Sequence, residues 1–291
     1  MWLAFYCRKP PALYSLPPTH ARFIHARQYH QRQHRRPLLA RTKSSTTTGD
    51  DAREDGAAPA SHRHRMSAST GQRELSVNVA ATTLLCSWQR MLFWPEQRTL
   101  FVADVHLGKA ASFRAAGVPM PTGHSEHDLS RISALLTAYQ ATRLVILGDM
   151  VHTRTSYTSA LDDNFKAFRA YHSAVDMILV RGNHDRHAGD APPAWGLIIV
   201  AEPFVLGPFA CCHEPGTAGD SGFELAGHLH PAIRLQTARE GATLPCFWRH
   251  TCGIVLPAFG SLTGNFTLRL KPSESAIVIA GQQLHEIKFR V

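Results

Sequence analysis

The sequence of 291 residues lacks long apolar runs, a regular cysteine pattern and, over its first 49 residues, any acidic side chain. No uninterrupted apolar stretch approaches the roughly 20 residues that a membrane-spanning helix needs, so nothing in the sequence predicts an integral membrane protein. The hydrophobic fraction of 44% excludes wholesale disorder. We therefore expect a soluble globular protein without a membrane partner.

The cysteines are few and irregularly spaced, which excludes the disulfide framework of a small secreted domain. Neither a C-x-x-C pair nor a zinc-ribbon spacing occurs. Idle or buried thiols are typical of a reducing compartment, and we expect a cytoplasmic protein. The six residues are Cys7, Cys86, Cys211, Cys212, Cys246 and Cys252.

The positive charge of the chain is concentrated at one end. The sequence has 31 basic and 22 acidic residues, a net charge of +9 that by itself favours nucleic-acid or membrane partners. Nine of the basic residues lie within residues 1–49, so the rest of the chain carries 22 residues of each sign. The net charge therefore says little about what the main part of the chain binds.

Residues 1–70 differ in composition from the remainder of the chain and are rich in Arg, His, Gln, Pro, Ser and Thr. They show no sustained helical or strand period, and we predict a basic, disordered N-terminal extension. A transit peptide is one alternative, although the apolar opening at residues 2–6 is too short for a secretory signal. Another is an upstream reading frame with Met66 as the working start. Residues 71–291 are predicted to form a single domain.

From about Leu75, short β-rich runs alternate with amphipathic stretches, which predicts an α/β fold. Helices are expected around residues 126–139 and 160–171, because apolar residues recur there every three or four positions. Buried strands are expected at residues 99–103, 144–147, 177–180 and 197–200. Shorter, mainly β runs are expected at residues 204–206, 209–212, 224–226, 232–235, 253–256, 276–280 and 284–289.

Side chains of metal-ligand type lie directly after several predicted strands, which is where α/β folds build their sites. Any single one is commonly a turn or cap residue. Five such segments in one chain are better explained by a shared site. The segments are DVH (104–106), GDMVH (148–152), GNHD (182–185), CHE (212–214) and GHLH (227–230).

Histidine, asparagine and carboxylate ligands suit divalent Mn, Fe or Zn, and the lack of a thiolate pattern argues against a closed structural zinc site. Seven such ligands are too many for one ion and suit two. Two ions about 3.5–4 Å apart clamp a phosphoryl group and lower the pKa of a bound water. Asp149 is the natural bridging carboxylate, because it lies between the other early ligands in chain order and beside Gly148.

The order D-x-H, G-D-x-x-H, G-N-H-D, a lone His and G-H-x-H resembles the calcineurin-like metallophosphoesterase superfamily. The resemblance implies a four-layer α/β/β/α sandwich with a binuclear site at the strand ends. It implies that His184 is the catalytic histidine, oriented by Asp185, and that no covalent phosphoenzyme forms. The implied ligands are Asp104, His106 and His230 for one ion, Asn183, His213 and His228 for the other, and Asp149 for both.

Longer stretches resemble one branch, the bacterial ligase-associated DNA damage response endonucleases of the PdeM type. They are ADVHLGKAASFRAAGVPMPTG, LVILGDMVHTR, LVRGNHDRHAGDAP, LAGHLHPAIRL, LPCFW and VLPAFGSLTG, and they cover most of residues 100–265. The resemblance implies a DNA endonuclease with two divalent ions, Mn first and Fe, Co or Zn as alternatives. It also implies DNA ligase and helicase as repair partners. The oligomeric state is not predicted.

Basic residues near the predicted ligands are candidates for phosphate contacts, with solvated surface charge as the equal alternative. They are Lys109, Arg114, Arg154, Arg181 and Arg186. Candidates to orient ligands are His152, His187 and Asp190. Two other functions stay open. Residues 66–291 are nearly neutral, with 19 basic and 18 acidic residues, which suits a phosphatase or phosphodiesterase for a nucleotide or other small phosphoester. A non-catalytic repair-complex module would be expected to have lost ligands.

Overall fold

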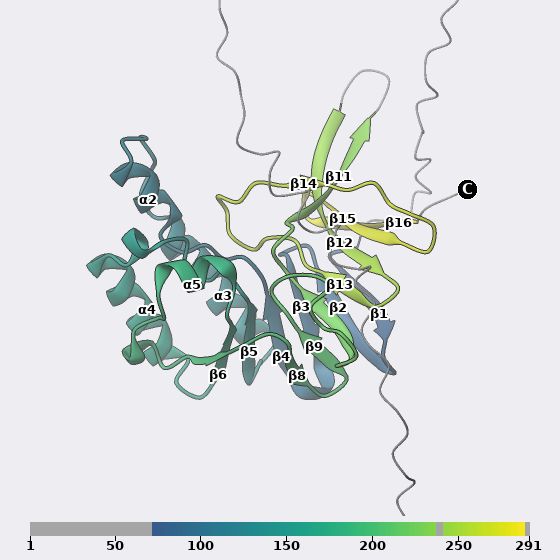
Figure 1. The fold of residues 1–291 in the computed structure, drawn as a ribbon, viewed down its shortest axis with the longest axis horizontal. Coiled ribbons are helices and arrows are strands. Elements are labelled where there is room, and N and C mark those ends of the chain that lie inside the picture. The colour runs from purple at the N-terminus through teal and green to yellow at the C-terminus, as the bar shows by residue number, and fades with distance from the viewer. Residues whose placement is uncertain (1–71, 237–240, 289–291) are drawn as a thin grey trace, which may run out of the picture. The chain divides into compact units, whose positions relative to one another are not determined.

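The computed structural model describes residues 72–236 and 241–288, all within the unit of the chain that spans Ala60–Val291. The predicted extension at residues 1–70 and the last residue of the predicted strand at 284–289 lie outside the described residues. The described part consists of two packed β-sheets with helices against one of them (Figure 1). None of its helices has the length and apolar character to cross a membrane.

The first sheet has seven strands in sequence order. Its antiparallel part is β1 (Glu74–Val79), β2 (Thr82–Ser87), β3 (Met91–Trp94) and β4 (Thr99–Val102). Its parallel part continues from β4 through β5 (Arg143–Leu147) and β6 (Asp176–Val180) to β7 (Ile198–Val200). Because β4, β5 and β6 are parallel neighbours, their carboxyl ends lie side by side at one edge.

The crossovers between the parallel strands carry the helices. They are α2 (Lys109–Ala115), α3 (His124–Ala138), α4 (Ser159–Tyr171) and α5 (Asn183–Ala188), with short 3-10 turns η2 (Arg154–Ser156) and η3 (Pro193–Trp195). A further 3-10 turn, η1 (Pro95–Gln97), joins the antiparallel strands β3 and β4. Helix α3 forms where its sequence predicts it, because Leu129, Ile132 and Leu136 recur on one buried face. Helix α4 is capped at its N-terminus by Thr158, whose side chain accepts a hydrogen bond from the Leu161 backbone N–H.

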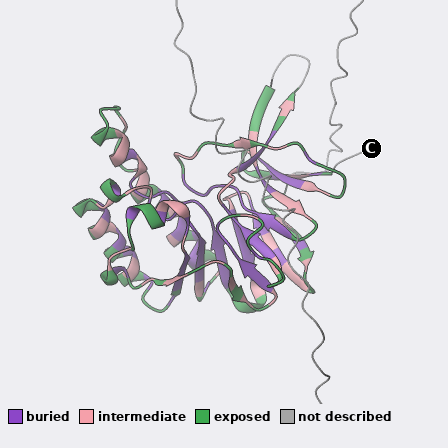
Figure 2. Cartoon of the chain, in the orientation of Figure 1, coloured by how far each residue is buried: buried purple, intermediate pink, exposed green. Residues whose placement is uncertain are grey.

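The parallel strands are buried on both faces, which is why they are continuous apolar runs. In β4, Leu100 and Val102 pack in the cluster with the helices, whereas Phe101 packs between the sheets. The burial colouring shows the same contrast between buried strands and the exposed outer sides of the helices (Figure 2). Phe209 and Phe247 of the second sheet are fully buried in the inter-sheet cluster.

The second sheet follows the order β14-β11-β12-β13-β10-β9-β8, and β15 pairs with β12 and β16. The bounds are β8 (Phe204–Leu206), β9 (Phe209–Cys211), β10 (Phe223–Ala226), β11 (Pro231–Gln236), β12 (Gly241–His250), β13 (Gly253–Val255), β14 (Phe266–Thr267), β15 (Ser275–Ala280) and β16 (Gln283–Lys288). Strands β9, β10 and β13 are mutually parallel neighbours. The ends of β9 and β10 supply the remaining predicted ligands.

The predicted α/β sandwich is confirmed. On the outer face of the second sheet, the structure has a loop at the place where the resemblance implies a second layer of helices. Between residues 189 and 236 and from 241 to 288 there is no α-helix. Instead, Ala218 in the loop after β9 packs over Cys212 and Val255 on the outer face of the second sheet. Residues 214–222, EPGTAGDSG, contain one proline and three glycines, which disfavour a helix at this position.

Candidate metal centre

The carboxyl ends of strands from both sheets meet at the predicted site. Asp104 and His106 follow β4, Asp149 follows β5, and Asn183 opens α5 just after β6. From the second sheet, His213 follows β9, and the pair His228 and His230 follows β10. The structure thus brings together side chains that lie more than a hundred residues apart in the chain.

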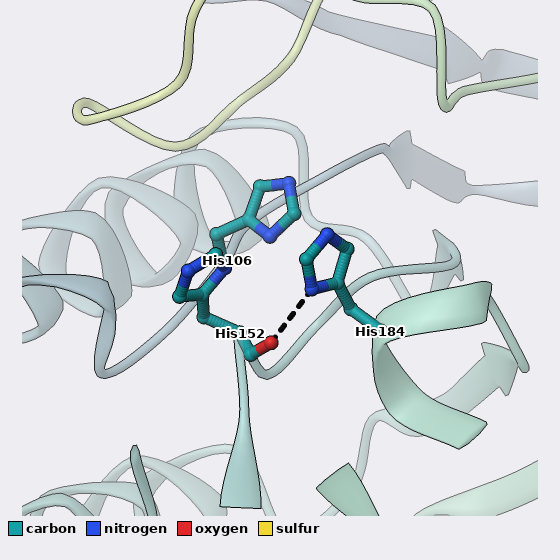
Figure 3. Close-up of side chains that lie close together, drawn as sticks. All are labelled: His106, His152 and His184. Atoms are coloured by element: carbon teal, nitrogen blue, oxygen red, sulfur yellow. Dashed lines mark hydrogen bonds between the residues drawn. The ribbon is translucent and has the colours of Figure 1, made fainter. Parts of the chain in front are cut away.

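The potential ligand atoms fall into groups in which every atom lies within 4.8 Å of the others. Asp104, His106 and His230 form one group, and Asp149, His213 and His228 form a second. These groups match the two predicted ligand sets, except that Asn183 joins the second through a 2.8 Å contact between its Oδ1 and His213 Nε2. A third group is His106 with His152 and His184 (Figure 3).

Several buried polar atoms of this centre have no hydrogen-bond partner among the described residues. They are Asp104 Oδ1, both ring nitrogens of His106, and His230 Nε2. Asp104 is fully buried and His106 is 5% exposed. An unsatisfied buried polar group costs about 1–3 kcal/mol, and more when it is charged. A divalent cation would satisfy Asp104 Oδ1, His230 Nε2 and one of the two His106 nitrogens, so the residues present fit the metal that the sequence predicts.

The backbone at the ligands is strained. Asp104, His106, Asp149, His228 and His230 all have positive φ, between 50° and 68°. Such left-handed conformations cost non-glycine residues of order 1–3 kcal/mol each and cluster at functional sites. Here they turn the chain directly after a strand, so that the side chain points toward the edge where the two sheets meet.

Gly148 allows the two sheets to approach each other at the site. Its φ is +78°, and a Cβ at this position would lie 2.1 Å from His213 Nδ1. Only glycine both adopts this conformation easily and leaves room for the imidazole. The glycine before Asp149 is therefore required by the histidine of the opposite sheet.

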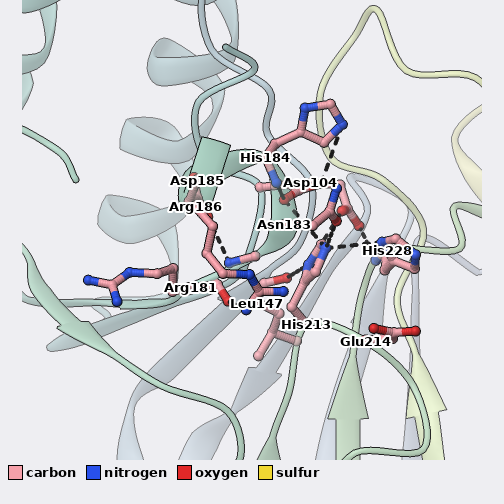
Figure 4. Close-up of polar contacts among 12 residues, drawn as sticks. Asp104, Leu147, Arg181, Asn183, His184, Asp185, Arg186, His213, Glu214 and His228 are labelled. Atoms are coloured by element: carbon pink, nitrogen blue, oxygen red, sulfur yellow. Dashed lines mark hydrogen bonds and ion pairs between the residues drawn. The ribbon is translucent and has the colours of Figure 1, made fainter. Parts of the chain in front are cut away.

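His213 is held in one ring orientation. Its Nδ1–H donates to the Leu147 carbonyl at 3.1 Å, and its backbone N–H donates to Glu202 (Figure 4). The other ring nitrogen, Nε2, faces Asp149 Oδ1 at 3.4 Å and His228 Nδ1 at 3.1 Å. A ligating histidine is commonly fixed in this way, with one nitrogen bonded to a carbonyl and the other free for a cation.

His184 lies next to Asp149. Its backbone N–H donates to Asp149 Oδ1 at 2.8 Å, and its Nε2 lies 3.9 Å from Asp149 Oδ2. Its Nδ1–H donates to the carbonyl of His152 at 2.7 Å, and the two rings stack at 4.8 Å (Figure 3). Nε2 is therefore the atom that His184 presents to the centre.

Asp185 contacts backbone groups of two neighbouring loops. Its carboxylate accepts from the backbone N–H groups of Gly182, at 3.0 Å, and Val151, at 3.2 Å. It ties together the loops after β5 and β6, whereas the ring of His184 is oriented by His152. Burial raises the pKa of Asp185, and these backbone N–H groups oppose the rise.

The electrostatics favour neutral imidazoles beside the carboxylates. Burial lowers the pKa of His106 far below its usual range, and burial with the charge of Lys109 lowers the pKa of His152 to about 4. The pKa of His228 is also lowered by burial. Burial raises the pKa of Asp149 to about 6, with His213 acting in the opposite direction. Neutral imidazole is the form that binds a cation.

A segment far along the chain pins the backbone of Asp104. The N–H of Phe259 donates to the Ala103 carbonyl at 2.8 Å, and the N–H of Gly260 donates to the Asp104 carbonyl at 3.1 Å. A Cβ at Gly260 would lie 2.3 Å from the Val105 carbonyl oxygen, so only glycine allows this approach. Arg131 of α3 donates to the Phe259 carbonyl at 3.0 Å and holds the segment in place.

The predicted basic residues differ in their surroundings. Arg114 donates to the carbonyls of residues 120 and 121, Arg181 pairs with Asp190 at 2.7 Å, and Arg186 contacts Glu202 at 3.7 Å. Arg154 is exposed in η2. Lys109 is half-buried, and Asp104 and Asp149 both act on its charge.

The other candidate residues from the sequence make contacts within the protein. The Nδ1–H of His187 donates to the Asn183 carbonyl. Cys211 packs between the sheets, Cys212 packs under the loop after β9, and the cysteines in the described part of the chain are free thiols. His152, in contrast, lies in the ligand cluster beside His106 and His184.

The packed sheets, with carboxylate, amide and imidazole groups gathered at their common edge, define the class of metal-dependent phosphoester hydrolases. A calcineurin-like phosphoesterase family model matches residues 97–240. The chain is similar to the crystal structure of Pseudomonas putida nuclease MPE, with a sequence identity of 34% and a TM-score of 0.65. The match covers 74% of this chain and 100% of that one. The chain belongs to the calcineurin-like phosphoesterase family and is a hydrolase of phosphoester bonds.

A more distant structure is the E. coli phosphoesterase Yfce, with 15% identity and a TM-score of 0.34, over 65% of this chain and 97% of that one. A search of curated proteins gave no match. The family assignment rests on the family model and on the Pseudomonas nuclease.

Proposed function

We propose that the protein is a binuclear metal-dependent phosphodiesterase that cleaves DNA as an endonuclease of a DNA damage response pathway. The observation that carries this proposal is the buried cluster of two ligand groups, in the first of which Asp104 Oδ1, the His106 ring nitrogens and His230 Nε2 lack hydrogen-bond partners among the described residues. The similarity of the chain to the Pseudomonas putida nuclease supports a nucleic-acid substrate. DNA ligase and helicase are the repair partners that the sequence resemblance implies.

In this proposal Asp104, His106 and His230 hold one cation, with Mn as the first choice. Asn183, His213 and His228 hold the other, and Asp149 serves both. When bound, the cations polarise the phosphoryl group and lower the pKa of water. The neutral imidazoles would add no positive charge of their own beside the ions.

His184 acts on the leaving oxygen. Its Nδ1–H is committed to the His152 carbonyl, which fixes the ring, and its Nε2 points toward Asp149. In the imidazolium form, Nε2–H donates a proton to the leaving oxygen as the phosphodiester bond breaks. Asp185 holds the loop that carries His184.

The test uses the full chain, stripped of metal and then titrated with Mn. We expect Mn-dependent hydrolysis of bis-p-nitrophenyl phosphate and cutting of circular DNA, which only an endonuclease can open. Single-stranded and duplex circles report the strand preference. A protein that binds Mn but leaves both the diester and the DNA intact would refute the proposal.

His184→Ala is expected to lower diester hydrolysis about 10²–10⁴-fold, the usual contribution of a positioned general acid. The matched control is His127→Ala, because the side chain of His127 is 66% exposed on α3. Equal rates for the two variants would remove His184 from the mechanism.

A second candidate function is hydrolysis of a nucleotide or other small phosphoester. It is favoured by the engagement of Arg114, Arg181 and Arg186 in contacts within the protein, which leaves few free charges for a long polyanion. Hydrolysis of p-nitrophenyl phosphate and nucleotides, with circular DNA left uncut, would establish this function in place of the first.

A further inference from the structure

A recess lies beside the ligand cluster, between the first turns of α2 and α3. His106 and Lys109 line one side of it, and His124, Ser125 and Leu262 line the other. His106 lines the recess and is also a member of the ligand cluster, so the recess lies directly next to that cluster. Its enclosed space is about 10 Å³, room for one oxygen-sized group and far too small for a nucleobase.

Lys109 supplies the charge in this recess. It is half-buried, and its ammonium group makes no hydrogen bond or ion pair with the part of the chain that the structure describes. Burial lowers the pKa of Lys109, and the carboxylates of Asp104 and Asp149 oppose this shift. Because these two carboxylates are the ones assigned to the cations, cation binding leaves Lys109 without a counter-charge. A second anionic group would then complete the site.

The opposite side of the recess is compatible with an anion. His124 opens α3, and its Nδ1 lies 3.4 Å from Ser261 Oγ. Gly123 provides no side-chain cap, so backbone N–H groups of the first turn lack a capping acceptor. Ser125 Oγ accepts from the Gly108 N–H at 2.9 Å and joins the starts of the two helices.

The one carboxylate that lines the recess is already neutralised. Asp128 Oδ1 accepts from Arg131 at 3.0 Å, and Oδ2 accepts from the backbone N–H of Ser261 at 3.1 Å. Both oxygens are therefore occupied, and the charge is paired with a guanidinium group. Asp128 shapes the recess without repelling an anion from it.

We propose that the recess takes one oxygen of a second phosphate of the substrate, the phosphate next to the scissile diester, and that Lys109 and His124 contact this phosphate. The proposal rests on the proposed function and specifies its substrate class as a diester that carries a neighbouring phosphate. The proposal is based on the half-buried Lys109 and the space beside it, and the first turn of α3 adds backbone N–H donors. An isolated small diester leaves the recess empty.

The test compares dinucleotides that share one scissile bond. Thymidylyl-thymidine lacks a flanking phosphate, whereas the same dinucleotide with a 5′- or a 3′-terminal phosphate carries one. For the Mn-loaded full chain, we expect kcat/KM to be about tenfold higher for one of the phosphorylated forms, mainly through KM. The quantity that decides is the ratio of kcat/KM with and without the flanking phosphate.

Lys109→Met and His124→Ala are expected to bring this ratio close to one. The matched control is Lys166→Met, because Lys166 is on the surface of α4 and pairs with Asp162; its ratio is expected to equal that of the wild type. A variant that slows every dinucleotide equally and keeps the ratio would overturn the subsite. So would a wild type that cleaves the dinucleotides without preference, and in that case the diesterase function stands. Failure to cleave bis-p-nitrophenyl phosphate removes the function and the subsite together.

Discussion

The middle and the carboxyl ends of the same strands bury opposite kinds of side chain. In the middle of the sandwich, Phe101, Val145 and Ile178 pack against Phe209 and Phe247 in an apolar cluster. Just past the strand ends, the chain buries carboxylates and imidazoles almost as completely. Asp104, Asp149, Asp185 and His213 are each at most 4% exposed.

This contrast shows that stability and chemistry reside in different parts of one sandwich. Burial of apolar side chains favours folding by about 25 cal/mol per Å². Unpartnered polar atoms and positive φ angles disfavour it. The strand ends are therefore tolerated because the middle of the sandwich offsets their cost, and cation binding removes part of that cost.

Asp149→Asn tests the ligand cluster past the strand ends, and it has the largest expected effect. We expect Mn-dependent hydrolysis of bis-p-nitrophenyl phosphate to fall at least about 10³-fold, since the amide cannot supply the charge that holds two ions. We also expect the metal-free protein to melt at a higher temperature at pH 7.5. The raised pKa of Asp149 means that its ionised form opposes folding. A wild-type rate in this variant would refute the bridging role.

Phe247→Ala tests the apolar middle. We expect a loss of about 3–5 kcal/mol in the free energy of unfolding, measured by urea denaturation of the metal-free protein. The rate per folded molecule should stay near that of the wild type, because Phe247 does not reach the ligands. Tyr171→Ala is the matched control: Tyr171 is 74% exposed, and its loss should cost little. Loss of activity in fully folded Phe247→Ala would erase the separation between the two regions.

Gly148→Ala tests the junction between the regions, with Gly117→Ala as its control. The two glycines have similar φ, +78° and +81°, but a Cβ meets His213 in the first case and nothing within 4 Å in the second. We expect Gly117→Ala to cost about 1 kcal/mol and Gly148→Ala about 2–3 kcal/mol, the excess coming from the clash. Gly148→Ala should also bind fewer Mn ions per chain by elemental analysis. Equal losses of stability would show that the approach of His213 is not what requires glycine.

The smallest expected effect is the dependence of Mn affinity on pH. The histidines with lowered pKa stay neutral on mild acidification, whereas Asp149, with a pKa of about 6, takes up a proton. We expect the affinity to be nearly constant above pH 7 and to fall roughly tenfold per pH unit below about 6, as one proton competes with the metal. Calorimetric titration at several pH values measures this. A fall that begins well above pH 7 would point to a different competing group.

The fold was predictable where local sequence and tertiary burial agree. The parallel strands β4, β5 and β6 were located to within a residue or two, because strands buried on both faces are continuous apolar runs. Strands β1 and β2 were not predicted, since their turn uses Ala80 and Ala81 at positive φ in place of glycine or asparagine. Helix α2 buries only Ala110 and so has no apolar period to detect.

The candidate site was predictable as a set of residue types and spacings, but its detailed contacts were not. The D-x-H and G-H-x-H spacings identify Asp104 and His230 as candidates without any knowledge of the fold. The hydrogen bond from His184 to the carbonyl of His152 has no sequence signature, because every residue has a carbonyl. For the same reason the backbone partners of Asp185 could not be foreseen. The G-D-x-x-H spacing was the one available signal for His152.

The pinning of Asp104 by Gly260 has a consequence for the newly made chain. A ribosome releases Asp104 and Asp149 long before it reaches His230, and Gly260 emerges later still. Neither ligand group is complete while the chain ends before the second sheet. If these groups hold the metal as proposed, we expect metal to be acquired after translation of the C-terminal half, and activity to begin once both sheets have packed on each other.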